Sequence, residues 1–480
     1  MIEDLFFDVV DDDDPLISAH DAHLLTDICH QCGRKVTGGA GLCNRCATRQ
    51  SDRVQRQDLL AAGRPEIALT GQQEKALEKV VDWYADPSAG QVFRLFGYAG
   101  TGKTTIARLM PEAVGANSWY YGAFSGKAVN VLSSKSCVPA HTLHALIYGP
   151  PENLKATLRA LEERYDSGEI SPEEAAYLRE EIAKFKALIR RHGGLAFNLA
   201  ENALLGAGCD LLIVDEVSMV NEQMASDLLS FGMKTLVLGD PFQLPPVRGE
   251  GSLTRARPDV MLTEVVRQSL DSPITELATR IREGGTIYAE DYERDRLWHQ
   301  YDQILTWKRA TRWKAVRHLR EMRGAPEGVP VAGDRVMCLA NNKRLKVFNG
   351  QTWRVLDVED GRVEDERMLH LVEDGAPDGA PVFSSYAYTT ALTEADEKSA
   401  EEGRLGSGED SAMLVTFADA LTVHKAQGSE WPNVLVMDET RSMRAMEERR
   451  SDPLTADTTV RRWLYTAVTR GKQTVGMVRR

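Results

Sequence analysis

Short apolar runs alternate with helical patterns from residue 69 onward. The clearest runs occupy residues 92–95, 211–214, 235–238 and 434–437. Short, mostly apolar runs separated by helical segments are typical of strands that are buried on both faces of a parallel sheet. The pattern therefore predicts an α/β fold with parallel sheets.

A polar helical stretch separates the first two of these runs. Apolar residues recur at helical spacing in 154–165 and again in 178–189, and Ser171, Pro172 and Glu174 form a capping box ahead of the second pattern. We expect a helical insertion at about residues 150–200 of the first α/β domain.

A second insertion is expected at about residues 345–416. Its β-type runs, 353–358 and 368–372, are joined by Gly, Pro and acidic turns. This alternation predicts a small β-rich, barrel-like subdomain within the second half of the chain.

Charge is distributed unevenly along the 480 residues. Lys and Arg number 58 against 71 Asp and Glu, a formal net charge of −13 at pH 7. Residues 1–14 contain seven acids and no base, and residues 394–410 carry a net charge of −5. The overall charge argues against binding by bulk positive charge, but the rest of the chain is nearly neutral and could still present a local basic groove. Residues 1–24 predict an acidic disordered tail, which is a candidate partner-binding or DNA-mimicking arm.

The sequence contains no apolar run of the roughly 18 residues that cross a bilayer. Its first residues are acidic, whereas a secretory signal begins with basic residues. We therefore expect a cytoplasmic protein in a reducing compartment.

Four of the seven cysteines form two CxxC pairs. Cys29 and Cys32 are separated from Cys43 and Cys46 by a glycine-rich stretch. Two such turns can present four thiolates to one Zn²⁺, which replaces the core that so short a module lacks. Residues 25–50 therefore predict a zinc-ribbon-like module with a structural metal, and residues 51–65 a linker. Redox pairs and free thiols are the alternatives.

Residues 97–104 carry the strongest chemical signal. They fit the P-loop pattern of Gly, four residues, Gly-Lys-Thr, and they follow the apolar run at 92–95. Such a loop turns its backbone N–H groups toward phosphates, Lys103 reaches the β and γ oxygens, and the Thr104 hydroxyl binds Mg²⁺. The sequence thus predicts an ATP site.

Two further strand ends complete a hydrolytic site. Asp215 and Glu216 follow the run at 211–214, where Asp215 can hold Mg²⁺ through water and Glu216 can accept a proton from the attacking water. Gln243 follows the run at 235–238, and glutamine orients water in other P-loop hydrolases. These residue types predict ATP hydrolysis rather than binding alone.

Taken in chain order, the motifs resemble superfamily 1 helicases, most closely the RecD/Dda-type branch. Residues 69–73 look like the adenine-reading element, 123–128 and 141–144 like two DNA-contact motifs, and 420–430 and 464–472 like the closing motifs. One departure is Phe124-Ser125, where the family often has Pro-Thr.

The resemblance implies tandem RecA-like domains, at residues 66–256 and 257–480. It also implies specific roles for named residues. The catalytic set is Lys103, Glu216, Gln243, Arg267 and Arg470. The ATP-contacting set is Gln73, Gly97, Gly100, Thr101, Gly102, Lys103, Thr104, Thr105, Asp215 and Glu430. The strand-contacting set is Phe124, Ser125, Lys127, Thr142, His144, Asn341, Asn342, Thr422, His424 and Lys425.

The activity implied by the resemblance is ATP-dependent DNA unwinding, with movement 5′-to-3′ along single strands. ATP, Mg²⁺ and a structural Zn²⁺ are the expected cofactors. Single-stranded DNA and forks are the expected partners, together with replication or recombination proteins that could bind the cysteine module or the acidic tail. An RNA helicase, and a nucleotide-switched motor subunit without autonomous unwinding, are the alternatives.

Overall fold

The computed structural model describes most of the chain from residue 68 onward and parts of the region before it. The described residues are 27–28, 35–36, 48, 50–56, 68–148, 152–166, 174–175, 177–183, 186, 195–196, 205, 208–245, 252–266, 272–292, 298–342, 344–345, 347–377, 379–395, 397 and 412–479.

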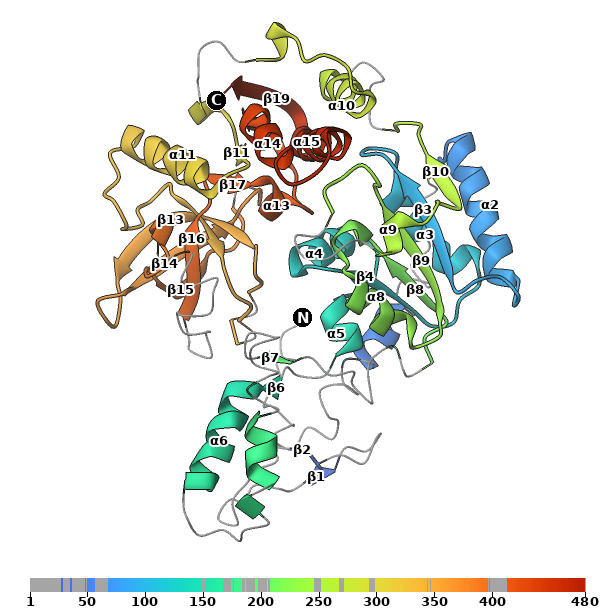
Figure 1. Ribbon diagram of the computed structural model, residues 1–480, viewed down its shortest axis with the longest axis horizontal. Helices are drawn as coiled ribbons and strands as arrows, with labels where there is room; N and C mark the ends of the chain where they lie inside the picture. The colour runs from blue at the N-terminus through green and yellow to red at the C-terminus, as the bar shows by residue number, and fades with distance from the viewer. Residues whose placement is uncertain are drawn as a thin grey trace.

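The first domain is a parallel sheet of six strands with helices on both faces (Figure 1). The strand order is β10-β3-β9-β8-β4-β5. Their bounds are β3 Val92–Gly97, β4 Trp119–Ala123, β5 Ala140–Thr142, β8 Leu211–Val214, β9 Lys234–Gly239 and β10 Val260–Leu262. The three predicted strands in this domain are confirmed. Because β10 pairs with β3, the domain extends beyond the boundary expected after residue 256.

Two helical layers cover this sheet. Buried residues of α2 (Gly71–Ala85), α3 (Lys103–Ala113) and α4 (Gly126–Ser134) pack on one face. Residues of α5 (Leu143–Ile147), η2 (Val217–Met219), α8 (Glu222–Leu229) and α9 (Ser252–Arg255) pack on the other. The strands are therefore buried on both sides, which explains their almost uniformly apolar sequences.

The expected helical insertion begins with α6 (Leu154–Asp166), which projects from the first domain at the bottom of Figure 1. Short strands β6 (Glu152–Asn153) and β7 (Leu195–Ala196) pair antiparallel at its base. Leu178 of the second predicted helical pattern is buried in a helical segment, 177–183, whereas the capping residues Ser171 and Pro172 lie outside the described residues.

Residues 51–56 of the stretch expected to be a linker are helical and pack on the first domain, so the expectation was wrong for these residues. Asp52 contacts the His141 Nε2 atom at 3.1 Å, and Arg56 donates to the Trp119 carbonyl at 2.7 Å. The Arg56 guanidinium also lies 4.5 Å from the centre of the Tyr120 ring. These contacts fix the helix against the strand edge at β4 and β5.

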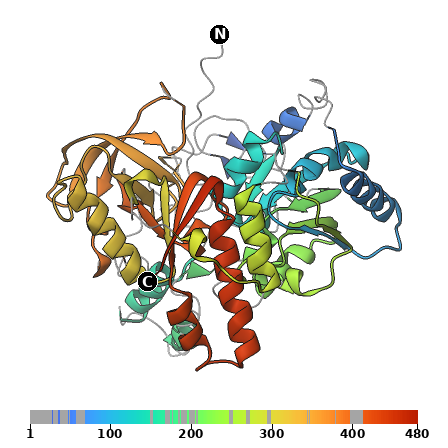
Figure 2. The ribbon, with the colours of Figure 1, turned by 90° about the horizontal axis from the view of Figure 1, so that it is seen from above.

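The second domain has a parallel sheet with the order β17-β11-β18-β19. The strands are β11 Gln303–Thr306, β17 Ala420–Thr422, β18 Trp431–Asp438 and β19 Gly471–Arg479. The surrounding helices are α10 Pro273–Glu283, α11 Arg309–Met322, α13 Val423–Ala426, α14 Thr440–Glu447 and α15 Pro453–Val468, with short helices η3 Ala289–Asp291 and η4 Trp298–Gln300. Viewed from above, α10 and α15 lie side by side (Figure 2).

The predicted β-rich insertion is a closed barrel of β12 to β16. Its strands are β12 Arg335–Cys338, β13 Thr352–Asp360, β14 Glu366–Glu373, β15 Phe383–Tyr388 and β16 Ala412–Phe417. The barrel thus begins about ten residues earlier than the expected boundary at residue 345. It closes because β12 pairs with both β13 and β16.

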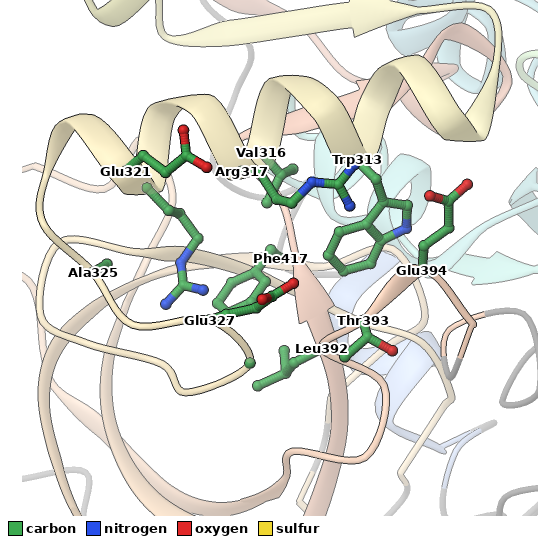
Figure 3. Close-up of a pocket in the computed structure, with 12 residues that line it drawn as sticks. Trp313, Val316, Arg317, Glu321, Ala325, Glu327, Leu392, Thr393, Glu394 and Phe417 are labelled. Carbon is green, nitrogen blue, oxygen red and sulfur yellow. The ribbon is translucent and has the colours of Figure 1, made fainter.

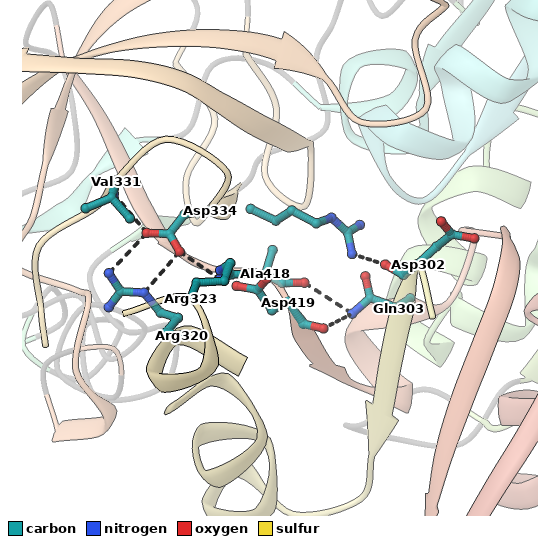
Figure 4. A network of polar contacts seen from close by, with 9 residues as sticks. Asp302, Gln303, Arg320, Arg323, Val331, Asp334, Ala418 and Asp419 are labelled. Carbon is teal, nitrogen blue, oxygen red and sulfur yellow. Dashed lines mark hydrogen bonds and ion pairs between the residues drawn. The ribbon is translucent and has the colours of Figure 1, made fainter. Parts of the chain in front are cut away.

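A buried ion-pair network joins the barrel entrance to α11 and the second sheet (Figure 4). Arg320 contacts Asp334 at 3.1 Å, and Arg323 reaches Asp334 at 2.9 Å and Asp419 at 2.8 Å. The Gln303 side chain donates to the Ala418 carbonyl at 3.2 Å. Because one carboxylate serves Arg320 of α11 and Arg323 directly after it, the start of the barrel is held in one orientation relative to the second domain.

Candidate functional site

The P-loop connects β3 to α3. Gly100 and Gly102 have φ angles of +81° and +79°, which residues with a Cβ adopt only at an energetic cost. The Lys103 amine donates to the carbonyls of Gly97 and Tyr98 at 2.7 and 2.9 Å. The loop therefore already has its compact turn, and the lysine lies against the backbone of the residues that open it.

The N-terminus of α2 is attached to this loop through Gln73. Thr70 and Gln73 form a reciprocal capping box, and the Gln73 amide donates to the Thr101 carbonyl at 3.1 Å. A Cβ added at Gly102 would lie 2.3 Å from the Gln73 amide nitrogen. The φ angle favours glycine at 102, and a larger residue there would also displace the Gln73 amide. The predicted adenine-reading element therefore lies beside the P-loop.

Asp215 and Glu216 directly follow β8 and lie next to the start of α3. The Thr104 hydroxyl donates to Asp215 at 3.3 Å, so the two predicted Mg²⁺ contacts are adjacent. Glu216 has φ +51°, and its N–H donates to Asp215 at 2.9 Å. Burial and the neighbouring Asp215 raise the pKa of Glu216, while Arg470 and Lys103 partly oppose this rise. A carboxylate with a raised pKa is a suitable proton acceptor.

Gln243 follows β9 in a buried turn. Its N–H donates to the Asp240 carbonyl at 3.2 Å, and its Oε1 atom is buried without a hydrogen-bond partner among the described residues. A buried amide oxygen without a partner is costly in a finished core. At a hydrolytic site, the same oxygen can accept a hydrogen bond from water.

Of the two predicted arginines, Arg470 lies within the described residues and Arg267 does not. Arg470 follows α15 and is buried, and its guanidinium donates to the carbonyls of Thr466 and Ser429 at 3.1 and 3.2 Å. Its charge acts on Glu216 of the first domain. Arg267 lies outside the described residues, but the Val266 N–H donates to the Gly100 carbonyl at 3.0 Å. The backbone therefore contacts the P-loop one residue before Arg267.

The first group of expected strand contacts surrounds α4 and α5. Ser125 and Thr142 cap these helices, accepting from the N–H groups of Ala128 and Ala145. The rings of Phe124 and His144 meet edge to face, with centroids 5.9 Å apart. Burial lowers the pKa of His144, which favours its neutral form. Hydroxyl, aromatic and imidazole groups thus gather at one end of the first sheet.

Lys127, an expected strand contact, lies at the border with the second domain. Its amine lies 5.2 Å from the centre of the Trp431 ring, which belongs to the second domain. Burial lowers the pKa of Lys127 to about 8. A Cβ at the adjacent Gly126 would lie 2.7 Å from the Phe348 ring, so the start of α4 contacts the second half of the chain closely.

The second group is also partly engaged. Lys425 pairs with Glu397 at 2.9 Å, Asn341 accepts from the Asn349 N–H, and Asn342 accepts from the Leu345 N–H. Thr422 precedes α13 and makes no capping bond through its side chain, and burial lowers the pKa of His424. Lys425 and the two asparagines therefore have local structural partners, whereas Thr422 and His424 lie together at the carboxyl end of β17.

The remaining predicted contacts have mixed outcomes. Thr105 lies in the first turn of α3, and Glu430 lies 3.8 Å from Lys472. Cys29, Cys32, Cys43 and Cys46 lie outside the described residues, although β1 (Asp27–Ile28) and β2 (Lys35–Val36) pair antiparallel around the first two. Within the described part of the chain, no group of three or more His, Cys, Asp or Glu residues is placed to hold a metal.

Tyr465 is a site residue for which the sequence predicted no role. Its hydroxyl bonds to both the P-loop and Asp240. Arg282 of α10 also lies 3.7 Å from the centre of the Tyr98 ring. Spacing alone gave no signal for these contacts because both cross between domains.

A separate cavity of about 180 Å³ lies beneath α11. Trp313, Val316, Leu392 and Phe417 form its apolar wall, and charged side chains surround it (Figure 3). None of the predicted site residues lines it. No helix in the described part of the chain has both the length and the apolar character needed to cross a membrane.

Comparison with known proteins gives consistent matches. Residues 68–303 match the AAA domain family, and residues 417–451 match the UvrD-like helicase C-terminal domain. The ATP-dependent RecD2 DNA helicase of Deinococcus radiodurans is 26% identical over 383 residues, which is 69% of this chain and 48% of the relative. This chain thus spans about half the length of that curated relative.

Solved structures of Pif1 helicases have a similar fold. The Bacteroides Pif1 complex with ADP-AlF3 and ssDNA has a TM-score of 0.50 and 18% identity, covering 86% of this chain and 92% of that one. The Candida albicans Pif1 structure has a TM-score of 0.45 and 17% identity, covering 86% and 94%. At this identity, the likeness concerns the fold.

Proposed function

We propose that this chain, which belongs to the superfamily 1 helicases of the RecD/Dda type, is an ATP-driven motor that moves along single-stranded DNA and unwinds duplexes. The observation that carries the proposal is the meeting of two domains at one site. The P-loop, Asp215 and Glu216 come from the first sheet, and buried Arg470 comes from the second and acts electrostatically on Glu216.

Each residue then has a proposed role, which for the described residues is supported by their positions. Lys103 leaves the carbonyls of Gly97 and Tyr98 to bind the phosphates of ATP, which carry more negative charge. Thr104 and Asp215 would hold Mg²⁺, which neutralises phosphate charge when bound. Glu216 takes the proton of the attacking water, and Gln243 orients that water through its buried amide oxygen. Arg267 and Arg470 stabilise charge that develops on the γ-phosphate.

Movement follows from the same arrangement. Arg470 contributes only while the second domain is against the P-loop, so hydrolysis and release of phosphate weaken the contact between domains. We propose that Phe124, Ser125, Thr142 and His144 hold the strand in the first domain. Thr422, His424, Asn341, Asn342 and the lysines Lys127 and Lys425 hold it in the second domain or at its border. Alternate tightening of the two groups moves the chain, in the proposed 5′-to-3′ direction.

The experiment compares three proteins with MgATP and single-stranded DNA or RNA: wild type, Lys103→Ala, and the exposed control Lys79→Ala. We expect DNA-stimulated hydrolysis in wild type and Lys79→Ala, and a fall of roughly 100-fold or more in Lys103→Ala, with an unchanged melting temperature. Stimulation by RNA alone would replace DNA with RNA as the substrate. Unwinding of 5′-tailed but not 3′-tailed duplexes tests direction, and the opposite preference would contradict the branch assignment.

We also propose that residues 25–50 form the zinc-ribbon-like module, with Cys29, Cys32, Cys43 and Cys46 as ligands. The antiparallel pair β1 and β2 supports this, because it brings the chain back on itself around the first CxxC turn. Replication or recombination proteins are the proposed partners of this module and of the acidic tail.

A further inference from the structure

The Tyr465 hydroxyl sits between the two domains with a fixed hydrogen-bond direction. Asp240 presents a carboxylate that can only accept, and its Oδ2 atom lies 2.6 Å from the hydroxyl. The Ala99 N–H can only donate, and it lies 3.1 Å from the same oxygen. Tyr465 therefore donates to the end of β9 and accepts from the P-loop at the same time.

Tyr465 is buried, so water does not replace these bonds when one is lost. Burial and the nearby Asp240 raise the pKa of Tyr465, which keeps the hydroxyl protonated and able to donate. The Phe242 ring meets the Tyr465 ring edge to face at 5.3 Å. The side chain thus has one orientation, and that orientation depends on groups of both domains.

The neighbouring residues attach the Gln243 turn to the second domain. The Leu244 N–H donates to the Thr466 hydroxyl at 3.0 Å, and the Gln427 amide donates to the Leu244 carbonyl at 3.0 Å. The turn is part of the first domain in sequence, but its far side rests on α15 and on the residue after α13. The position of Gln243 therefore depends on α15, as does that of Arg470, which follows the same helix.

The P-loop end of this connection lies beside Lys103, the residue proposed to bind the phosphates of ATP. Lys103 donates to the carbonyls of residues 97 and 98, directly before the N–H that Tyr465 accepts from. When phosphates draw Lys103 away, the peptide groups of these residues lose two bonds to a charged donor. The next N–H along the backbone is that of Ala99, which donates to Tyr465 of α15.

We propose that Tyr465 is a positioning residue that couples occupancy of the P-loop to the placement of Gln243 and Arg470 around the γ-phosphate. This inference rests on the proposed ATPase function. Tyr465 touches neither ATP nor water in this role. It acts through the P-loop backbone, through Asp240, and through the helix that carries Arg470.

The test uses Tyr465→Phe, which keeps the ring and removes the hydroxyl. The matched control is Tyr292→Phe, because the Tyr292 hydroxyl also donates to a carboxylate, that of Asp438 at 2.5 Å, within the second domain and away from the P-loop. Melting temperature, kcat and KM for MgATP are measured with and without an oligo-dT strand.

We expect Tyr465→Phe to lower kcat by roughly 10- to 100-fold, the range for losing a hydrogen bond to a charged group in the productive state. KM should change less than threefold, and DNA stimulation should fall with kcat. Tyr292→Phe should keep the wild-type kcat while losing similar thermal stability. Asp240→Asn should also lower kcat, and the double variant should be no slower than the slower single variant, because both changes break one connection.

Equal kcat values for Tyr465→Phe and Tyr292→Phe in an active wild-type background would overturn this inference alone. Strictly multiplicative losses in the double variant would also overturn it. A wild-type chain that binds but does not hydrolyse ATP would overturn the proposed function, and this inference with it.

Discussion

Replacing Glu216 with glutamine should remove activity and increase stability at the same time. The carboxylate is enclosed beside Asp215, and burial together with that neighbour raises its pKa. Its ionised form is therefore less favourable in the folded protein than in the unfolded chain. Glutamine has nearly the same shape and carries no charge, so it relieves this cost while losing the proton acceptor.

The two effects have different sizes and different pH dependence. Loss of a general base lowers kcat by roughly 10²- to 10⁴-fold. The pKa of Glu216 is raised in the folded state, so proton binding by Glu216 favours the folded state. This contribution to stability is complete below the pKa that Glu216 has in the unfolded chain, and it is lost as pH rises through its pKa in the folded protein. At pH 8 the free energy of unfolding of the variant should thus exceed that of wild type by roughly 0.5–2 kcal/mol, which corresponds to a few degrees of melting temperature. This advantage should shrink toward pH 4.5.

The assay is thermal unfolding of nucleotide-free protein between pH 4.5 and 8, with ATP turnover measured on the same preparations. Glu222→Gln is the control, since Glu222 is an exposed residue at the start of α8. Loss of its charge at a helix N-terminus should lower stability by less than about 1 kcal/mol, the opposite sign to Glu216→Gln, and should leave turnover unchanged. A variant at Glu216 that is less stable than wild type at pH 8, or that retains its turnover, would refute the reasoning about this carboxylate.

Three further results are expected. Glu397→Ala removes the carboxylate that pairs with Arg312 and with Lys425 in a buried site, so urea unfolding should show a loss of roughly 3–5 kcal/mol, against less than about 1 kcal/mol for the exposed Glu359→Ala. The melting temperature of Lys127→Met should exceed that of wild type most at pH 7, where the buried amine is charged. This advantage should shrink from pH 8, the approximate pKa of Lys127, to pH 10.5. A difference in melting temperature that does not depend on pH would contradict the burial argument. Purified protein should contain about one Zn²⁺ per chain by elemental analysis, and Cys29→Ser should lower that content; a metal-free wild type would refute the cysteine assignment.

The single-domain part of the ATP site was predictable because parallel strands deliver their carboxyl ends to one edge of the sheet. Val214 ends β8 and Gly239 ends β9, so Asp215 and Gln243 had to lie near the P-loop once three apolar runs were identified. The chemistry of each residue followed from its type. The pattern did not reveal which contacts the second domain makes with this site.

Residues whose partners lie in another domain were predicted less well. Lys127 lies in the predicted DNA-contact motif, and the ring near its amine is that of Trp431, about three hundred residues later in the chain. Residues 51–56 have a linker's polar composition, but Asp52 and Arg56 are spaced i, i+4 and reach the neighbouring strands β5 and β4. That spacing was the available signal. Strand β10 is only three residues long, too short for an apolar run to reveal it.

The structure thus separates two kinds of residue at one site. Lys103 is held by the backbone of the first domain and Thr104 by the Asp215 side chain of the same domain, so their proposed contribution to ATP binding does not require the second sheet. Gln243 and Arg470 are held through α15, which contacts the P-loop by way of Tyr465. A nucleic acid that alters the contact between domains can therefore change the rate of hydrolysis without changing the affinity for ATP. Stimulation by a bound strand is the expected consequence of this division.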